Sequence, residues 1–403
     1  MKKLFAFTFV ALLFSVSVFA QGKLKTGIWR GVLKPAAGEL PFNFEVKDTA
    51  GRQQLTIINA NERFKVTDIK FNADSVFINM PLFDSEFKLQ QQGAGLTGQW
   101  IKHLGNRDAA TPFTATYGDK WRFFKSPEKP FLNISGRWSA VFGEGADRDT
   151  TVGEFKQTGN RITGTFLTTT GDYRYLEGSV SGNKLYLSCF DGGHAFLFTA
   201  TIKDGQTITD GHFGTTPWAA VKNANAKLPD AYSLTVLKPG YKRIDFSFPD
   251  LNGQKVSLND ARFKNKVVIL QVMGSWCPNC MDETAYLVNY YKKYHNKGVE
   301  VVGLAYERTA DFEKSKKAVT QEKNHFNIPY PLLLTGYTNN KKETAKSLPM
   351  LSNFLAFPTT IIIDKKGEVR KIYTGFSGPG TGAYYSGFVN EFERLTDNLL
   401  AEK

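Results

Sequence analysis

Short runs of alternating apolar and polar residues dominate the first half of the chain. Clear examples lie at residues 42–46, 75–80 and 184–189. Alternation of this kind is typical of half-buried β-strands, and helical periodicity is scarce before residue 222. The pattern predicts that residues 21–222 are nearly all β.

The β-rich region also repeats. The stretch around Trp29 resembles the stretch around Trp138, and residues 74–78 align with residues 183–187. The 109 positions between the two tryptophans set the period, and a unit of that length is of single-domain size. We therefore expect two units, each a small up-and-down barrel or a β-sandwich, at residues 21–128 and 129–222.

A different pattern begins after residues 223–240, which follow neither periodicity and which we interpret as a linker. An apolar run at 267–273 is followed by a segment with one apolar helical face, at Leu287, Val288, Tyr291 and Tyr294. Further extended segments are expected at 299–304, 330–334, 357–364 and 368–374. We expect a polar helical stretch at 311–323 and a closing amphipathic helix at 388–399. The order predicts an α/β domain over 241–403.

The first twenty residues have the composition of a signal peptide. Lys2 and Lys3 precede an apolar stretch at 4–18, and Val18-Phe19-Ala20 is typical of a cleavage site. No later stretch is long and apolar enough to span a membrane. We expect residues 1–20 to be removed and the mature chain to be exported as a soluble periplasmic protein.

Composition excludes several classes of protein. Three cysteines in 403 residues are too few for a disulfide scaffold. The net charge of +13 comes from lysines scattered along the chain. Because no basic stripe is interleaved with aromatic residues, we expect no nucleic-acid partner.

Two of the three cysteines form a Cys-x-x-Cys motif, Cys277-Pro278-Asn279-Cys280, between the apolar run and the helical segment. This order places Cys277 at a helix N-terminus, where free N–H groups and the helix dipole favour a thiolate. Cys280 is then placed to attack a disulfide formed by Cys277, which indicates a thiol–disulfide exchange centre. A zinc half-site and a purely structural disulfide are the alternatives, and zinc lacks further ligands nearby.

The motif resembles that of a known family. Trp276 before the cysteines, and Phe357-Pro358-Thr359-Thr360 before an apolar strand, resemble the thioredoxin fold. The lead-in at Asn252-Gly253, the Cys277–Glu283 stretch and an extra strand–helix segment at 304–334 resemble the exported TlpA/ResA type of thiol–disulfide oxidoreductase. The resemblance covers about 241–403. It implies that Pro358 is cis and that Phe357, Pro358 and Trp276 form the substrate groove.

One departure from the family concerns proton transfer. Thioredoxin has a buried aspartate six positions before its first motif cysteine, whereas this chain has Gln271 there. By resemblance to the TlpA/ResA type, Glu283 replaces it as the proton acceptor of Cys280. The alternative is that Glu283 is a solvated acid in a first helical turn.

These observations predict an enzyme that reduces disulfides of exported proteins, with Cys277 as nucleophile and Cys280 as resolving thiol. It would draw electrons from an upstream donor and need neither cofactor nor metal. A peroxiredoxin-type peroxidase and a ligand- or partner-binding protein whose β-units carry recognition are the alternatives. Cys189 alternates with apolar residues and is expected to be a buried core residue, and His194 to be a surface or hydrogen-bonded histidine.

Overall fold

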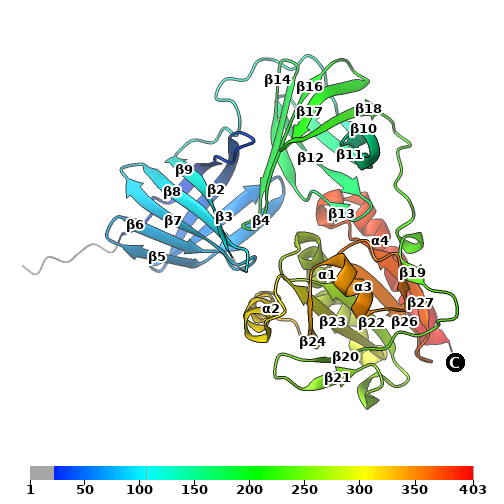
Figure 1. Ribbon diagram of the computed structural model, residues 1–403. Coiled ribbons are helices and arrows are strands. Elements are labelled where there is room, and N and C mark those ends of the chain that lie inside the picture. The colour runs from blue at the N-terminus through cyan, green and yellow to red at the C-terminus, as the bar shows by residue number, and fades with distance from the viewer. Residues whose placement is uncertain (1–21, 106, 403) are drawn as a thin grey trace, which may run out of the picture.

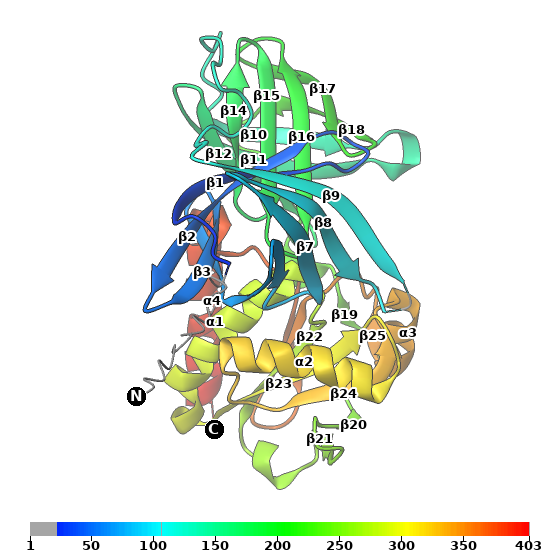
Figure 2. The ribbon, with the colours of Figure 1, turned by 90° about the vertical axis from the view of Figure 1, so that its left-hand side faces the viewer.

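The computed structural model describes residues 22–105 and 107–402, so the expected signal peptide lies outside the described residues. Figures 1 and 2 show three units that meet near the centre: an N-terminal β-unit, a second β-unit and a C-terminal α/β domain. Across the described part of the chain, no helix has the length and apolar character needed to cross a bilayer.

The first β-unit is a nine-stranded antiparallel sheet that curls into a barrel-like form (Figure 2). Neighbouring strands follow each other in the chain, except that β1 also pairs with β9. The sheet ends at β4 and β5, which are not paired with each other. The strands are β1 (Gly27–Leu33), β2 (Leu40–Thr49), β3 (Arg52–Asn59), β4 (Glu62–Val66), β5 (Asp68–Asn72), β6 (Ser75–Asn79), β7 (Ser85–Gln92), β8 (Gly95–His103) and β9 (Asp108–Tyr117).

The second β-unit closes. Strand β11 pairs with both β10 and β12, which joins the two ends of the strand order into an eight-stranded ring, with β13 paired outside it to β12. Closure leaves no free edge in that ring. The strands are β10 (Gly136–Phe142), β11 (Asp149–Thr158), β12 (Arg161–Thr168), β13 (Gly171–Asp172), β14 (Leu176–Ser181), β15 (Lys184–Phe190), β16 (Ala195–Ile202), β17 (Thr207–Phe213) and β18 (Thr216–Lys222).

The two units share a strand order and a tryptophan contact. Trp29 on β1 and Trp138 on β10 are both fully buried. Each indole Nε1 donates to the carbonyl oxygen four residues earlier, of Lys25 and of Ile134, at 2.9 Å in both cases. The tryptophan therefore closes the entry to the first strand in the same way in both units.

The C-terminal domain has a five-stranded sheet in the order β24-β23-β22-β26-β27. Strands β24, β23 and β22 pair in parallel. Strand β26 pairs antiparallel with both of its neighbours, β22 and β27. The central strand β22 is buried at every position because it has neighbours on both sides. The elements are β22 (Val267–Met273), α1 (Pro278–Tyr294), β23 (Val299–Glu307), α2 (Phe312–Phe326), β24 (Leu332–Thr338), α3 (Lys341–Ser347), β26 (Thr359–Ile363), β27 (Val369–Thr374) and α4 (Ala383–Ala401).

Short elements complete the domain. The hairpin β20 (Ser247–Pro249) and β21 (Lys255–Ser257) encloses Asn252-Gly253, the lead-in named above. Within 223–240, strand β19 (Val236–Leu237) pairs with β25 (Leu351–Ser352), so this segment also contributes to the C-terminal domain. Helix α3 has no counterpart among the elements expected from the sequence, because its residues are mostly polar and show no apolar face.

Candidate active site

The two motif cysteines lie where the central strand passes into a helix. After β22, residues 274–277 form a loop and α1 begins at Pro278; we call residues 274–282, this loop with the start of α1, the dithiol turn. Cys277 is the N-cap residue, and the Cys280 N–H donates to its Sγ at 3.2 Å. A disulfide joins Cys277 to Cys280, so the structure describes the oxidised chain. Cys277 is 4% exposed and Cys280 is 0% exposed.

The loop before β26 brings the expected groove residues to the sulfur. The Phe357–Pro358 peptide bond is cis. The Phe357 carbonyl oxygen lies 3.5 Å from Cys277 Sγ. The Trp276 ring packs edge-on against Phe357 at 5.5 Å, and its Nε1 donates to the Tyr306 carbonyl at 2.8 Å. Trp276, Phe357 and Pro358 are thus brought together beside Cys277.

Glu283 lies on α1, one turn after Cys280, and is 1% exposed. It is therefore not the solvated helix-start acid of the alternative interpretation. Its Oε2 accepts from Gln271 Nε2 at 2.9 Å, and its Oε1 accepts from the Thr360 hydroxyl. Burial raises the pKa of Glu283 to about 7, although both hydrogen bonds favour the ionised form.

Gln271 occupies the position where thioredoxin has its buried aspartate. Its Nε2 lies between the Cys280 carbonyl oxygen, at 3.3 Å, and Glu283. It also exchanges hydrogen bonds with the Thr284 hydroxyl. Gln271 therefore holds Glu283 against the resolving end of the dithiol turn, a role that its sequence position alone did not reveal.

The loop at 168–175, which includes β13 in the second β-unit, contacts the dithiol turn directly. In the amide orientation that satisfies both groups, Asn279 donates to the Asp172 carbonyl at 3.2 Å and accepts from its N–H at 3.0 Å. Asp172 Oδ2 accepts from the Gly378 N–H at 2.7 Å. Arg174 Nη1 donates to the Pro278 carbonyl at 3.2 Å. The sequence analysis assigned no role to Arg174.

Arg174 is the centre of a buried ion cluster drawn from all three units, which we call the Arg174 cluster. Its guanidinium lies 2.6 Å from Asp282 on α1, 2.5 Å from Glu62 on β4, and 3.5 Å from Asp191 of its own unit. Burial lowers the pKa of Arg174, but the three carboxylates outweigh it and hold that pKa well above the ordinary value. Burial raises the pKa of Asp282 to about 7 against the opposing effect of Arg174.

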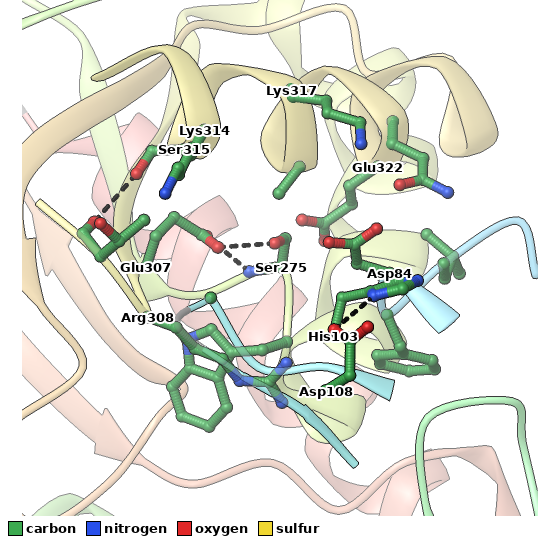
Figure 3. A pocket seen from close by; sticks show the side chains of 17 residues that line it. Asp84, His103, Asp108, Ser275, Glu307, Arg308, Lys314, Ser315, Lys317 and Glu322 are labelled. Carbon is green, nitrogen blue, oxygen red and sulfur yellow. Dashed lines mark hydrogen bonds and ion pairs between the residues drawn. The ribbon is translucent and has the colours of Figure 1, made fainter. Parts of the chain in front are cut away.

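The first β-unit meets the same helix with an apolar surface and a cleft. Met281 is buried in the core cluster of the first unit, which includes Met80 and Phe83. Beside it, a cleft of about 320 Å³ separates the first unit from α2 and reaches Ser275 and Trp276. Figure 3 shows charged side chains around this cleft, from the first unit and from the C-terminal domain: Asp84, His103, Asp108, Glu307, Arg308, Lys314, Lys317 and Glu322.

Glu307 at the end of β23 fixes one wall of the cleft. It accepts from the Ser275 N–H at 2.8 Å and from the Ser275 hydroxyl at 2.7 Å. Burial raises the pKa of Glu307, and burial together with Glu307 raises the pKa of Glu322 to about 8. Glu307 thus attaches Ser275, two positions before Cys277, to the end of β23.

The remaining candidates from the sequence lie away from the dithiol turn. Cys189 is 1% exposed, is free, and belongs to the core cluster of the second unit, as expected of a core residue. His194 is half-buried and lies 3.3 Å from Asp191. Among residues 22–105 and 107–402, no three His, Cys, Asp or Glu side chains are grouped so that they could hold a metal ion.

A central sheet, a dithiol at the N-terminus of the helix after its middle strand, and an adjacent cis-proline define a thioredoxin-like domain. Residues 238–385 match the Redoxin family. The chain is 30% identical to the thiol-disulfide oxidoreductase ResA of Bacillus subtilis over 131 residues, which are 32% of this chain and 64% of that protein. It is 30% identical to the thioredoxin-like protein YneN of the same organism over 139 residues, 34% of this chain and 73% of that protein.

Among solved structures, a thiol-disulfide oxidoreductase from Bacteroides fragilis aligns with 38% of this chain and 99% of its own, at 23% identity and a TM-score of 0.29. The match with YneN shows that the chain belongs to the family of thioredoxin-like proteins, and the chain spans just under two thirds of the length of the Bacillus subtilis ResA. The two curated relatives match only about a third of the chain each.

Proposed function

We propose that the protein is an exported thiol–disulfide oxidoreductase that reduces disulfides of other exported proteins. One observation carries the proposal: Cys277 and Cys280 form a disulfide at the start of α1, beside the cis peptide bond of Phe357 and Pro358. Export rests on the signal-like residues 1–20. Mass spectrometry of periplasmic material should find Gln21 as the first residue, and retention of Lys2 or Lys3 would contradict the removal of residues 1–20.

The reaction follows from the two thiols. The Cys277 thiolate attacks one sulfur of the substrate disulfide, and the other substrate sulfur leaves as a thiolate. Cys280 then attacks the mixed disulfide, forms the Cys277–Cys280 bond and releases the second substrate sulfur. The substrate gains two electrons and two protons, and an upstream dithiol must restore the enzyme. Glu283 would accept the proton of Cys280, through an arrangement that Gln271 and Thr360 hold in place.

A single-turnover experiment tests the activity without the upstream donor. The reduced chain is mixed with an excess of a substrate disulfide, and free thiols are counted after acid quenching. We expect two protein thiols to disappear as two substrate thiols form, and neither Cys277→Ser nor Cys280→Ser to complete the exchange. If the redox state of Cys277 and Cys280 does not change with any substrate, the pair is a purely structural disulfide.

The alternatives can be separated from this proposal. In a peroxidase, hydrogen peroxide would oxidise Cys277 and Cys280 faster than a disulfide does. The ratio of the oxidation rate with hydrogen peroxide to that with a disulfide therefore distinguishes the two activities. The ligand-binding alternative needs space inside a β-unit. The apolar interior of the first unit holds a cavity of only about 10 Å³, lined by residues such as Phe42 and Phe113. That volume holds one water molecule at most.

A further inference from the structure

The dithiol turn lies between the two β-units. On one side, Pro278, Asn279 and Asp282 contact the second unit. On the other side, Met281 is buried among apolar residues of the first unit. Cys277, which packs in the core cluster of the C-terminal domain, is itself 4% exposed. A folded protein with a surface disulfide therefore has no open approach to Cys277 Sγ in this arrangement.

The contact with the second unit requires backbones to approach closely, and three glycines permit it. A Cβ at Gly171 would overlap the Asn279 amide. A Cβ at Gly375 would lie 2.7 Å from the Thr170 carbonyl carbon, and one at Gly378 would lie 2.5 Å from Asp282 Oδ2. The Thr170 backbone cannot move aside, so a side chain at Gly375 would separate the two surfaces there. Side chains at Gly171 and Gly378 would instead displace the ends of Asn279 and Asp282, the two residues that carry the polar contact.

The Arg174 cluster holds this contact together. The Arg174 side chain is 3% exposed, and those of Asp282 and Glu62 are 15% and 12% exposed. One guanidinium thus links the second unit to both the first unit and α1. A buried guanidinium that donates charge-assisted hydrogen bonds to Asp282 and Glu62 through different nitrogens fixes their positions better than surface ion pairs do.

One approach to the dithiol turn is the cleft beside Trp276, which is lined by Ser275 and Trp276. Its volume of about 320 Å³ is at the small end of ligand sites, which span roughly 300–1,000 Å³. Of its cations, Arg308, Lys314 and Lys317 form no ion pair with any described residue. Figure 3 shows Lys314 on the side of Glu307 and Ser275, and Lys317 on the side of Glu322. A narrow disulfide compound can enter a cleft of this size, whereas a folded domain cannot.

We propose that Arg174 is a positioning residue that fixes the dithiol turn between the two β-units and thereby restricts Cys277 to narrow disulfides. Folded proteins then react only after the 168–175 loop has separated from the dithiol turn. The inference rests on the proposed function, because it concerns which disulfides the same two thiols reduce. The chemistry of each turnover is unchanged: two thiols are oxidised and one disulfide is reduced.

The test compares single-turnover rates of the reduced full chain with oxidised glutathione and with insulin, whose disulfides belong to a folded protein. Rates of dithiothreitol with the same two substrates correct for intrinsic reactivity. We expect the chain to prefer glutathione disulfide by roughly tenfold or more beyond dithiothreitol, the factor that about 1.4 kcal/mol of opening free energy supplies. Equal corrected rates would overturn the inference.

Two variants open the contact in different ways. Arg174→Gln removes the charge, and Gly171→Ala inserts a methyl group against Asn279. Both should lower the corrected preference for glutathione disulfide over insulin by about fivefold or more. The reason is that the 168–175 loop separates from the dithiol turn at a smaller cost in free energy. Arg161→Gln is the matched control, since Arg161 is exposed and pairs with Glu177 within the same unit. It should keep the preference of the natural chain, and an unchanged preference in both opened variants would overturn the inference.

A measurement on the natural chain covers the case in which the variants do not fold. Reduced Cys277 is labelled with N-ethylmaleimide and with a maleimide on a long polyethylene glycol chain, in the native and in the urea-unfolded chain. The large reagent should lose rate selectively in the native chain, and equal slowing of both reagents would contradict restriction by size. Failure of the chain to reduce either disulfide would instead overturn the proposed function, and the inference with it.

Discussion

The two β-units share a strand order and a buried tryptophan, yet they meet the dithiol helix with different chemistry. The first unit covers Met281 with apolar side chains. The second unit reaches the same turn with Asp172 and Arg174, through hydrogen bonds and ion pairs. A repeated fold has thus acquired two kinds of contact with one functional helix. Apolar contact supplies affinity without direction, whereas the polar contact fixes position.

The polar contact should show the largest effect when it is broken. Arg174→Gln leaves Asp282, Glu62 and Asp191 buried without their cation. We expect the free energy of unfolding to fall by about 3–5 kcal/mol, the cost of breaking a buried pair by removing one partner. Urea denaturation measures the change. Arg161→Gln should stay within about 1 kcal/mol of the natural chain, since Arg161 itself is exposed and Glu177 keeps its contact with Arg122. Equal losses in both variants would show that the cluster has no special role.

The apolar contact comes next. Met281 is 3% exposed, so Met281→Ala leaves a cavity in the core cluster of the first unit. We expect a loss of about 2–4 kcal/mol in the same denaturation experiment. Leu132→Ala, at a side chain that is 41% exposed, serves as control and should cost about 0.5 kcal/mol or less. A Met281 variant as stable as this control would mean that the first unit does not hold the helix.

The next prediction concerns Glu283, which lies inside the C-terminal domain rather than at either β-unit. It should make the free energy of unfolding depend on pH. Its pKa of about 7 in the folded chain lies above the ordinary 4.5. Because the fold penalises the ionised form, its stabilising contribution is complete below pH 4.5 and is lost as the pH rises through about 7. Relative to Glu283→Gln, the natural chain should lose about 2–3 kcal/mol over that interval.

The same variant has a kinetic consequence. Loss of the proton acceptor should slow resolution of the mixed disulfide by about tenfold or more near neutral pH. Loss of the negative charge should shift the pH–rate profile of Cys277 to lower pH. Stopped-flow kinetics over pH 5–9 reports both effects. Unchanged rates and an unchanged profile would show that Glu283 only fills space beneath the dithiol turn.

The smallest effect is expected at Cys189 in the second unit. Burial raises the pKa of this thiol well above its ordinary value, which makes it a poor nucleophile. Cys189→Ala should cost about 1 kcal/mol of stability and leave the single-turnover rate unchanged. Peptide mapping of the oxidised natural chain should find Cys189 as a free thiol. A disulfide from Cys189 to either motif cysteine would contradict this assignment.

Those parts of the molecule whose structure is determined by residues close together in the sequence could be predicted from it. The strand–turn–helix around Cys277 is encoded locally, by an apolar run, Pro278 in the first turn and a helical face. The repeat was visible because Trp29 and Trp138 recur with their strands. Resemblance to a family supplied Pro358 and Glu283, which lie far from or beyond the motif.

The rest depends on how the units approach each other. Arg174 lies in a loop, and its left-handed backbone, with φ of 56°, leaves no mark in the residue pattern. Its partners Glu62 and Asp282 come from other units, so no spacing could connect them. The sequence places Glu283 early in a helix but does not show which residues pack over it. Its burial therefore could not be predicted. Helix α3 has no apolar periodicity to reveal it.

The central claim is that Cys277 is the thiol that attacks substrate, and a trapped intermediate tests it most directly. A Cys280→Ser chain is reduced and mixed with oxidised glutathione, and the adduct is located by mass spectrometry of its peptides. The account predicts a mixed disulfide on Cys277 that persists, whereas the natural chain completes the exchange and a Cys277→Ser chain accumulates much less adduct. An adduct located on Cys189, or faster adduct formation at Cys280 in Cys277→Ser than at Cys277 in Cys280→Ser, would contradict it.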